Sequence, residues 1–171
     1  TEHKKEMYYF ENIARETQAE QDLNLDYIPE IKVIYTPNVP LQNRPVLHSS
    51  EQAVEILRGK FDPDTIQLFE TFKVILLSPS NRILGIYSAT QAIQTAVQVR
   101  VKLMFGTALK AGATSMIIAH NHPDDEARPS AADKNFTKGL KKIAKMLDIH
   151  LVDHIIISTN DYYSFREHKQ L

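Results

Sequence analysis

The sequence predicts an α/β domain built around a central β-sheet. From residue 49 onward, segments with helical periodicity alternate with short β-rich runs, which is the pattern of a sheet covered by helices. Hydrophobic residues make up 43% of the 171 residues, enough for a globular core and too many for a mostly disordered chain. The charges nearly cancel, with 20 Lys and Arg against 21 Asp and Glu, which argues against a strongly basic nucleic-acid module.

The composition also limits the kinds of site and the location. The chain contains no Cys, which excludes disulfide scaffolds, Cys-based zinc fingers and thiol nucleophiles, so a metal site must use His, carboxylates and water. No run of about 18 apolar residues occurs, and the N-terminus lacks the apolar stretch of a signal peptide. We therefore expect a cytoplasmic protein without a membrane span.

Residues 1–46 are expected to form an arm in front of the main domain. Apolar residues at helical spacing predict an amphipathic helix over residues 4–21, and a β-rich run predicts a short strand over residues 31–35. Three prolines between residues 37 and 45 predict an extended connection that cannot be helical. The main domain spans residues 47–171, and the arm could dock on it or on a second copy of the chain in a homo-oligomer.

A helix and a β-hairpin open the main domain. The helix predicted over residues 49–58 starts with a capping box of Ser49 and Gln52, and a glycine follows its end. The β-rich runs 72–77 and 82–87 flank a Ser-Pro-Ser-Asn turn, which predicts a hairpin.

The rest of the domain continues the alternation. We expect a helix over residues 97–110, a strand over 114–119, a long helix over 131–147, a strand over 150–158 and an edge strand over 162–165.

The residues that carry chemistry lie between the strand at 114–119 and the long helix. His120 and His122 stand two residues apart, and in an extended chain such residues point to the same side, so both imidazoles can converge on one point. Zn²⁺ takes His nitrogens at about 2.0–2.1 Å, and a catalytic zinc has a third protein ligand and an open position. Asp133 is the natural third ligand, because it lies on the apolar face of the long helix, where a carboxylate needs a partner.

Ordinary roles are also open for these residues. Ser130 and Asp133 fit the N-cap and the first-turn acid of an ordinary helix, a role that is compatible with metal binding. Asn121, between the two histidines, is expected to point the other way and to be structural.

Together these residues resemble a known family. The order His120-x-His122-Pro, followed by Ser130 and Asp133, resembles the JAMM metal-binding motif of JAB1/MPN-type metallopeptidases, and more closely the bacterial RadC family. The likeness continues through Leu-Asp-Ile-His-Leu-Val-Asp-His and the C-terminal Tyr-Tyr-Ser-Phe, and it covers roughly residues 49–165.

The resemblance implies a fold, a cofactor and an activity. The fold is a three-layer α/β/α JAB1/MPN domain with a mixed central sheet, related to the cytidine-deaminase fold, and the cofactor is Zn²⁺ held by the two His and the Asp. The implied activity is hydrolysis of a peptide or isopeptide bond in a peptide or protein substrate. Ser130 would donate to the developing oxyanion.

The resemblance also implies a glutamate that accepts a proton from the attacking water. By position this residue is Glu70, and strand alternation independently places Glu70 on the same side as the apolar residues of the 72–77 run. The alternative for Glu70 is a strand-entry residue that bends out to solvent.

Other functional classes stay open at this point. A DNA-associated module of a repair or mobile-element system, or a catalytically silent scaffold that keeps the metal, fits the same resemblance. Lys138 and Lys141 belong to a lysine stripe on the long helix that could contact phosphate, although a solvated helix face is the stronger interpretation. His154 could lie behind the metal ligands or be a satisfied histidine of the sheet.

Two departures from the family pattern lie where a substrate would approach. Asp124 and Asp125 follow the His-Asn-His-Pro run, where family members commonly have Ser-Gly, and the turn over residues 88–91 has no Gly. The metal ligands are intact, and the two acids add negative charge near the metal.

Overall fold

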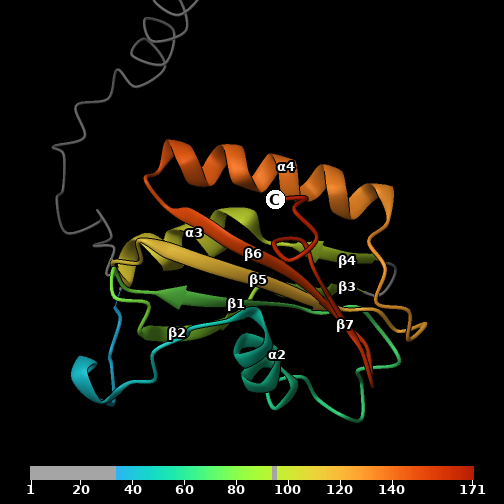
Figure 1. Cartoon of the computed structure of the whole chain (residues 1–171), viewed down its shortest axis with the longest axis horizontal. Coiled ribbons are helices and arrows are strands. Elements are labelled where there is room, and N and C mark those ends of the chain that lie inside the picture. The colour runs from blue at the N-terminus through green and yellow to red at the C-terminus, as the bar shows by residue number, and fades with distance from the viewer. Residues whose placement is uncertain (1–33, 94–95) are drawn as a thin grey trace, which may run out of the picture. The chain divides into compact units, whose positions relative to one another are not determined.

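A five-stranded mixed sheet forms the middle of the structure, a computed structural model that describes residues 34–93 and 96–171 (Figure 1). The strands lie in the order β2-β1-β5-β6-β7, and of the neighbouring pairs only β5 and β6 run parallel. Their bounds are β1 (Phe72–Leu77), β2 (Ile83–Ser88), β5 (Ser115–Asn121), β6 (His150–Ile157) and β7 (Tyr162–Ser164). The predicted hairpin, the strands predicted over 114–119 and 150–158, and the C-terminal edge strand are therefore confirmed.

Helices cover both faces of this sheet. In Figure 1, α2 (Ser50–Arg58) lies below the sheet, while α3 (Val101–Lys110) and α4 (Ala131–Met146) lie above it. One buried apolar cluster fills the space between the sheet and α3 and α4, and a second fills the space between the sheet and α2. The three-layer α/β/α arrangement expected of a JAB1/MPN fold is thus confirmed. Within the two described ranges, no helix combines the length and apolar character needed to cross a membrane.

The predicted start of α2 is confirmed with one change in its capping. The Ser49 side chain accepts a hydrogen bond from the Gln52 N–H at 3.2 Å. The Gln52 side chain accepts from the His48 N–H at 2.9 Å, one residue earlier than a standard capping box. The first bond satisfies an N–H group of the first helical turn, and the second fixes the residue before the N-cap.

The segment before α2 contains one turn of 3₁₀ helix, η2 (Leu41–Asn43). The prediction that the prolines exclude any helix is wrong here. Pro40 directly precedes the turn with a φ of −54°, and a proline fits the start of a helical turn because its missing N–H is not needed there. The helix predicted over residues 4–21 lies outside the described residues, as does most of the strand predicted over 31–35.

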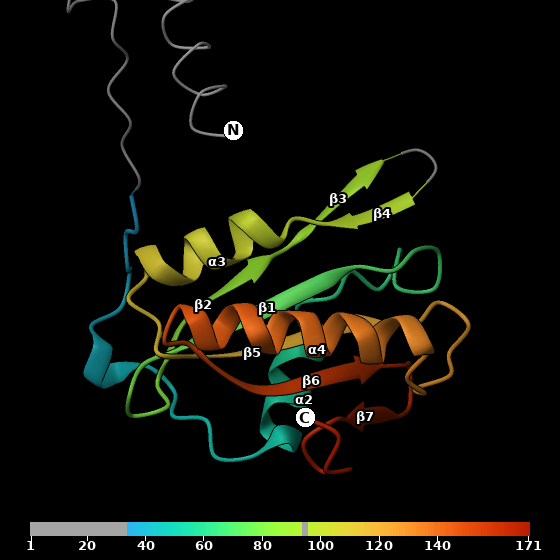
Figure 2. The same ribbon diagram turned by 90° about the horizontal axis from the view of Figure 1, so that it is seen from above.

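The helix predicted from residue 97 begins instead at Val101. The residues before it form β4 (Ala96–Val99), which pairs with β3 (Thr90–Ile93) in an antiparallel hairpin that is not predicted from the sequence. A Val-rich segment is compatible with a helix or a strand, and pairing with β3 stabilises the strand here. Figure 2 shows this hairpin reaching out beyond the main sheet.

A β-bulge in β6 determines which side chains face each helix layer. Met116 pairs with Leu151, but the next residue, Ile117, pairs with Asp153, so β6 carries one extra residue at this point. The extra residue reverses the alternation of the strand. Asp153 consequently faces the α2 side, and His154 faces the α4 side.

Asp153 is a buried carboxylate with four hydrogen-bond donors. Its Oδ2 accepts from the hydroxyls of Ser50 and Ser164 at 2.7 and 2.6 Å. Its Oδ1 accepts from the backbone N–H groups of His154 and Arg166 at 2.8 and 3.0 Å. These bonds join the start of α2, β6, β7 and the C-terminal segment around one buried carboxyl group.

We expect Asp153→Asn to lower the free energy of unfolding by about 2–4 kcal/mol, because an amide NH₂ would face buried donors that need an acceptor. Urea unfolding followed by circular dichroism measures this change. Asp148→Asn is the matched control, because Asp148 is exposed and has a φ of 53°, which Asn tolerates. Equal stability of the two variants would contradict the role given to Asp153.

Candidate metal centre

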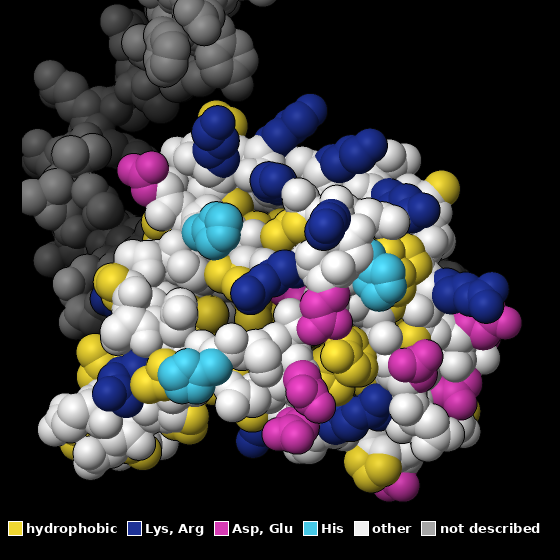
Figure 3. Space-filling model, in the orientation of Figure 1, with side chains coloured by type: hydrophobic (Ala, Val, Ile, Leu, Met, Phe, Trp, Pro, Cys, Tyr) yellow, Lys and Arg dark blue, Asp and Glu magenta, His cyan; other side chains and the backbone are white. Residues whose placement is uncertain are grey.

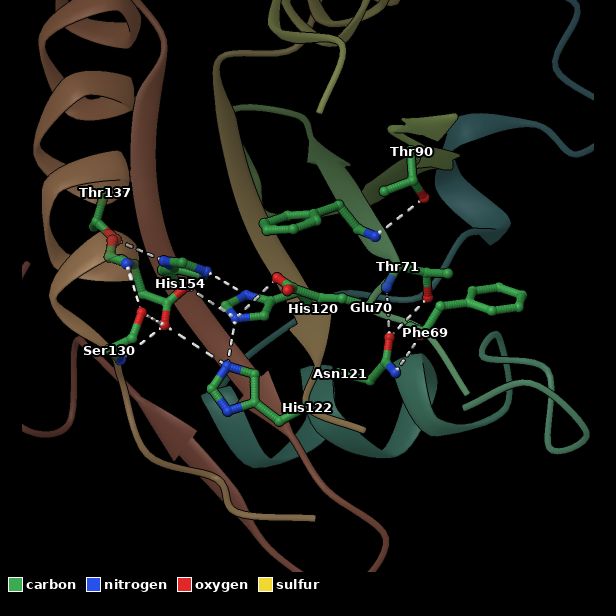
Figure 4. Close-up of polar contacts among 12 residues, drawn as sticks. Phe69, Glu70, Thr71, Thr90, His120, Asn121, His122, Ser130, Thr137 and His154 are labelled. Atoms are coloured by element: carbon green, nitrogen blue, oxygen red, sulfur yellow. Dashed lines mark hydrogen bonds and ion pairs between the residues drawn. The ribbon is translucent and has the colours of Figure 1, made fainter. Parts of the chain in front are cut away.

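The structure brings His120, His122 and Asp133 together where β5 ends and α4 begins. The Nε2 atoms of the two histidines are 3.0 Å apart, and Figure 4 shows the two rings meeting through these atoms. Asp133 Oδ1 is 3.2 Å from His120 Nε2, and Asp133 Oδ2 is 3.6 Å from His122 Nε2. One ligand atom from each of the three residues lies within 4.8 Å of the others, so the group could hold a metal ion.

Asp133 serves the start of α4 at the same time. Its Oδ2 accepts from the Ser130 N–H at 2.8 Å and from the Ser130 hydroxyl at 2.6 Å, and its own N–H donates to the Ser130 oxygen at 3.1 Å. The helix-cap role and the ligand role are therefore compatible. Burial would raise the pKa of Asp133, but the neighbouring His120, His122 and Ser130 side chains hold it well below its usual range.

The donor set fits a divalent metal ion. The Nδ1 atom of His122 lies 2.8 Å from the carbonyl oxygen of Glu126, which can only accept, so Nδ1 carries the proton and neutral His122 presents a bare Nε2. A hydrogen bond with Asp133 raises the pKa of His122. Two imidazole nitrogens at 3.0 Å beside a carboxylate call for a positive charge between them, either a proton or a metal ion. Two nitrogens and one oxygen are ligands that zinc commonly takes.

Glu70 reaches the same point from the segment before β1. Its Oε1 lies 3.6 Å from His120 Nε2, and its side chain is 36% exposed. Glu70 therefore faces the group of three residues while it stays open to solvent. Figure 4 shows its carboxylate beside the His120 ring.

Asn121 anchors the segment that carries Glu70. Its Oδ1 accepts from the N–H and the hydroxyl of Thr71, at 2.7 and 2.8 Å. Its Nδ2 donates to the carbonyls of Ile66 and Phe69, at 2.6 and 3.0 Å. The side chain of Asn121 thus has a structural role, because it holds the backbone on both sides of Glu70 by hydrogen bonds (Figure 4).

Further residues lie behind His120. His154 is buried, and its Nε2 is 2.8 Å from His120 Nδ1, while its Nδ1 is 2.6 Å from the Thr137 hydroxyl. Burial lowers the pKa of His154 well below its usual range. The Phe72 ring stacks on His120 with centroids 4.6 Å apart. The sequence does not single out Thr137; the one signal for it is its position one helical turn after Asp133 on the same helix face.

The loop before α4 accommodates the Asp-Asp departure. Asp125 has a φ of 62°, in the left-handed region that favours glycine and that Asp also adopts. Its carboxylate accepts a hydrogen bond from the Thr159 N–H, which lowers the pKa of Asp125. This bond connects the loop to the turn after β6. It stabilises Asp125 at a position where the resembled family commonly has a Gly.

An open cavity of about 590 Å³ adjoins the candidate ligands. Part of its lining is polar and includes Glu70 and Ser130, and part is apolar. The apolar lining includes Phe72, Val99 and Phe136. The cavity gives a molecule from solvent a route to His122 and Asp133.

Lys138 and Lys141 lie outside this cavity. Both are exposed on α4, whose inward face buries Asp133. Within residues 34–93 and 96–171, no carboxylate lies within 4.0 Å of either ammonium group. Figure 3, in the orientation of Figure 1, shows Lys and Arg side chains spread over the part of the molecular surface where α4 lies.

Comparison with known proteins gives consistent matches. The family profile of the RadC-like JAB domain matches residues 47–170. UPF0758 protein CT0611 of Chlorobaculum tepidum is 38% identical over 117 residues, which are 68% of this chain and 51% of that protein. A UPF0758 protein of Flavobacterium johnsoniae is 40% identical over 96 residues, which are 56% of this chain and 42% of that protein. The chain spans about half the length of these curated relatives.

We expect the protein to bind one divalent ion, with Co²⁺ or Zn²⁺ as the probe. Asp133→Ala should weaken metal affinity by more than about 100-fold, because loss of a hydrogen-bond partner behind a ligand already lowers metal affinity by about 10–100-fold. Equilibrium dialysis with metal analysis measures the stoichiometry and the affinity. His150→Ala, at an exposed histidine of β6, is the control and should bind like the wild type. Unchanged binding by Asp133→Ala would contradict this ligand set.

Proposed function

The chain belongs to the RadC-like JAB domain family, and from this premise we propose that it is a zinc-dependent hydrolase of peptide or isopeptide bonds. The observation that carries the proposal is the convergence of His120, His122 and Asp133, with Glu70 beside them, at an open cavity. Three protein ligands leave a position free, as in catalytic rather than structural zinc sites.

The residues around the ligands supply the proton transfers. Zinc, when bound, supplies a Lewis acid that brings the pKa of water toward about 7 and polarises the scissile carbonyl. Oε1 of Glu70 accepts a proton from the attacking water and then donates it to the leaving nitrogen. Asn121 supports this step, because its bonds to the backbone on both sides of Glu70 limit the movement of that carboxylate.

Ser130 is the proposed donor to the developing oxyanion. Its hydroxyl donates to Asp133 Oδ2, and the backbone N–H of Ser130 donates to the same oxygen. A rotation of the hydroxyl toward substrate therefore leaves Asp133 Oδ2 with a hydrogen-bond partner. The lining of the cavity by Ser130 and Glu70 supports both roles.

We expect Glu70→Gln to keep its metal and to lose about 10²–10⁴-fold in hydrolysis, because Gln cannot accept the proton of water. The assay measures cleavage of a quenched-fluorescent peptide library, and of an isopeptide-linked peptide pair, by zinc-loaded protein. Metal content is measured on the same samples.

Glu126→Gln is the matched control for this experiment. Glu126 is exposed, and its contact with His122 is made by its backbone carbonyl, so the side-chain change should leave hydrolysis intact. Full hydrolysis by Glu70→Gln at full zinc content would show that Glu70 is not the base. A wild-type protein that holds zinc and cleaves none of the probes would contradict the hydrolase proposal itself.

A second candidate function is binding to nucleic acid through α4. The observation that favours it is the exposure of Lys138 and Lys141, with no carboxylate partner in the described part of the chain. The formal net charge of −1 makes this candidate the weaker of the two.

The nucleic-acid candidate predicts salt-dependent retention of duplex DNA by metal-free protein. The double variant Lys138→Gln with Lys141→Gln should reduce the slope of log affinity against log salt by about 2, since each phosphate contact contributes about 0.9. Fluorescence anisotropy over a salt series measures this slope. Lys102→Gln with Lys110→Gln, on the exposed face of α3, is the control. Equal slopes for the two double variants would exclude α4 as the DNA contact.

A further inference from the structure

We propose that Thr137 and His154 are positioning residues that hold His120 in the one neutral tautomer whose Nε2 is bare and turned toward Asp133 and His122. The inference rests on the metal site of the proposed function and not on its hydrolytic step. It follows from the directions of three consecutive hydrogen bonds, each of which determines where the next proton lies.

The first bond joins Thr137 to the backbone of α4. The Thr137 hydroxyl oxygen lies 2.6 Å from the carbonyl oxygen of Asp133. A carbonyl oxygen can only accept, and a hydroxyl has a single proton to donate. The proton of Thr137 is therefore committed to the Asp133 carbonyl, and its oxygen is left as an acceptor.

The second bond then determines the tautomer of His154. Nδ1 of His154 lies 2.6 Å from the Thr137 oxygen. Because this oxygen has no proton left to donate, Nδ1 must carry the proton of the bond. His154 has no exposed surface, stacks on Phe165 at 4.8 Å, and lies among apolar and aromatic neighbours, where a neutral ring is favoured. A neutral ring with a proton on Nδ1 has a bare Nε2.

The third bond determines the tautomer of the candidate ligand His120. His154 Nε2 lies 2.8 Å from His120 Nδ1, and one proton must lie between the two nitrogens. Since His154 Nε2 is bare, His120 Nδ1 is the donor. His120 is then left with Nε2 as an acceptor, which shares the proton of His122 Nε2 at 3.0 Å until a metal ion replaces that proton.

His122 presents a bare Nε2 to a metal ion by a shorter route. Its Nδ1 proton is fixed directly by the carbonyl of Glu126 at 2.8 Å. An exposed loop carbonyl thus orients one imidazole, and a buried hydroxyl and imidazole orient the other. The bulge in β6 is required for the buried route, because a regular strand would turn His154 away from α4.

Removing the Thr137 hydroxyl should reverse the protons along this route. With no acceptor at Nδ1, His154 is free to carry its proton on Nε2 and to donate it to His120 Nδ1. His120 must then carry its own proton on Nε2, at the position where a metal ion would bind. Metal binding has to displace that proton and reverse both rings, which weakens the affinity.

The test compares Thr137→Val with the conservative Thr137→Ser. Val matches the shape of Thr without the hydroxyl, and Ser keeps the hydroxyl, so both variants should fold, which circular dichroism checks. We expect Thr137→Val to weaken Zn²⁺ affinity by about 10–100-fold in a chelator competition, and Thr137→Ser to restore it. We also expect the ¹⁵N shifts of His120 in metal-free protein at alkaline pH to report Nδ1–H in the wild type and Nε2–H in Thr137→Val.

Three results would overturn the inference. One is an unchanged zinc affinity in Thr137→Val, and another is equal weakening in Thr137→Ser. The third is an Nε2–H tautomer of His120 in the wild type, which can be observed even if Thr137→Val does not fold. None of these measurements uses hydrolysis, so a protein that binds zinc as expected but cleaves no peptide would contradict the proposed function and leave this inference standing.

Discussion

The parallel pairing of β5 with β6 is the contact on which the rest of the structure depends. Two adjacent parallel strands cannot be joined by a tight turn, so the chain must cross the sheet between them, and α4 makes that crossing. The first turn of the crossing helix consequently returns to the end of β5, where His120 lies. The same pairing contains the bulge that turns His154 toward α4. One backbone arrangement thus determines both the candidate ligands and the groups behind them.

Two buried carboxylates in this region are stabilised in different ways. Asp153 accepts hydrogen bonds only from hydroxyl and backbone amide groups. Asp133 accepts hydrogen bonds from Ser130 and also faces two imidazole nitrogens that can bind a metal ion. In the described residues no buried side-chain nitrogen or oxygen lacks a hydrogen-bond partner, so Asp133 is as well satisfied as Asp153. The difference lies in the chemistry of the partners, because only Asp133 lies beside groups that can bind a metal ion.

The sequence predicts those features that depend on local periodicity. The alternation of helices and strands, the cap at Ser49 and the placement of the histidines at the end of β5 follow from spacing along a single element. The β3–β4 hairpin and the bulge in β6 depend on pairing between strands, and the contact from Thr137 to His154 depends on how α4 packs against β6. Contacts of this kind join residues far apart in the sequence, so no local pattern of residues predicts them. The Asp in a left-handed loop position likewise becomes understandable only through its bond to Thr159.

The β3–β4 hairpin contributes to the cavity wall but does not belong to the sheet that positions the candidate ligands. Its two strands pair with each other and with no strand of the main sheet, and the hairpin is joined to β1 at its base, where the Ala89 N–H donates to the Phe72 carbonyl. Val99, at the end of β4, nevertheless lines the cavity beside the candidate ligands. Insertions or substitutions along the hairpin can therefore reshape the entrance without altering the sheet register that positions His120. The surface that a molecule from solvent meets at this cavity can therefore change while the positions of the candidate ligands stay fixed.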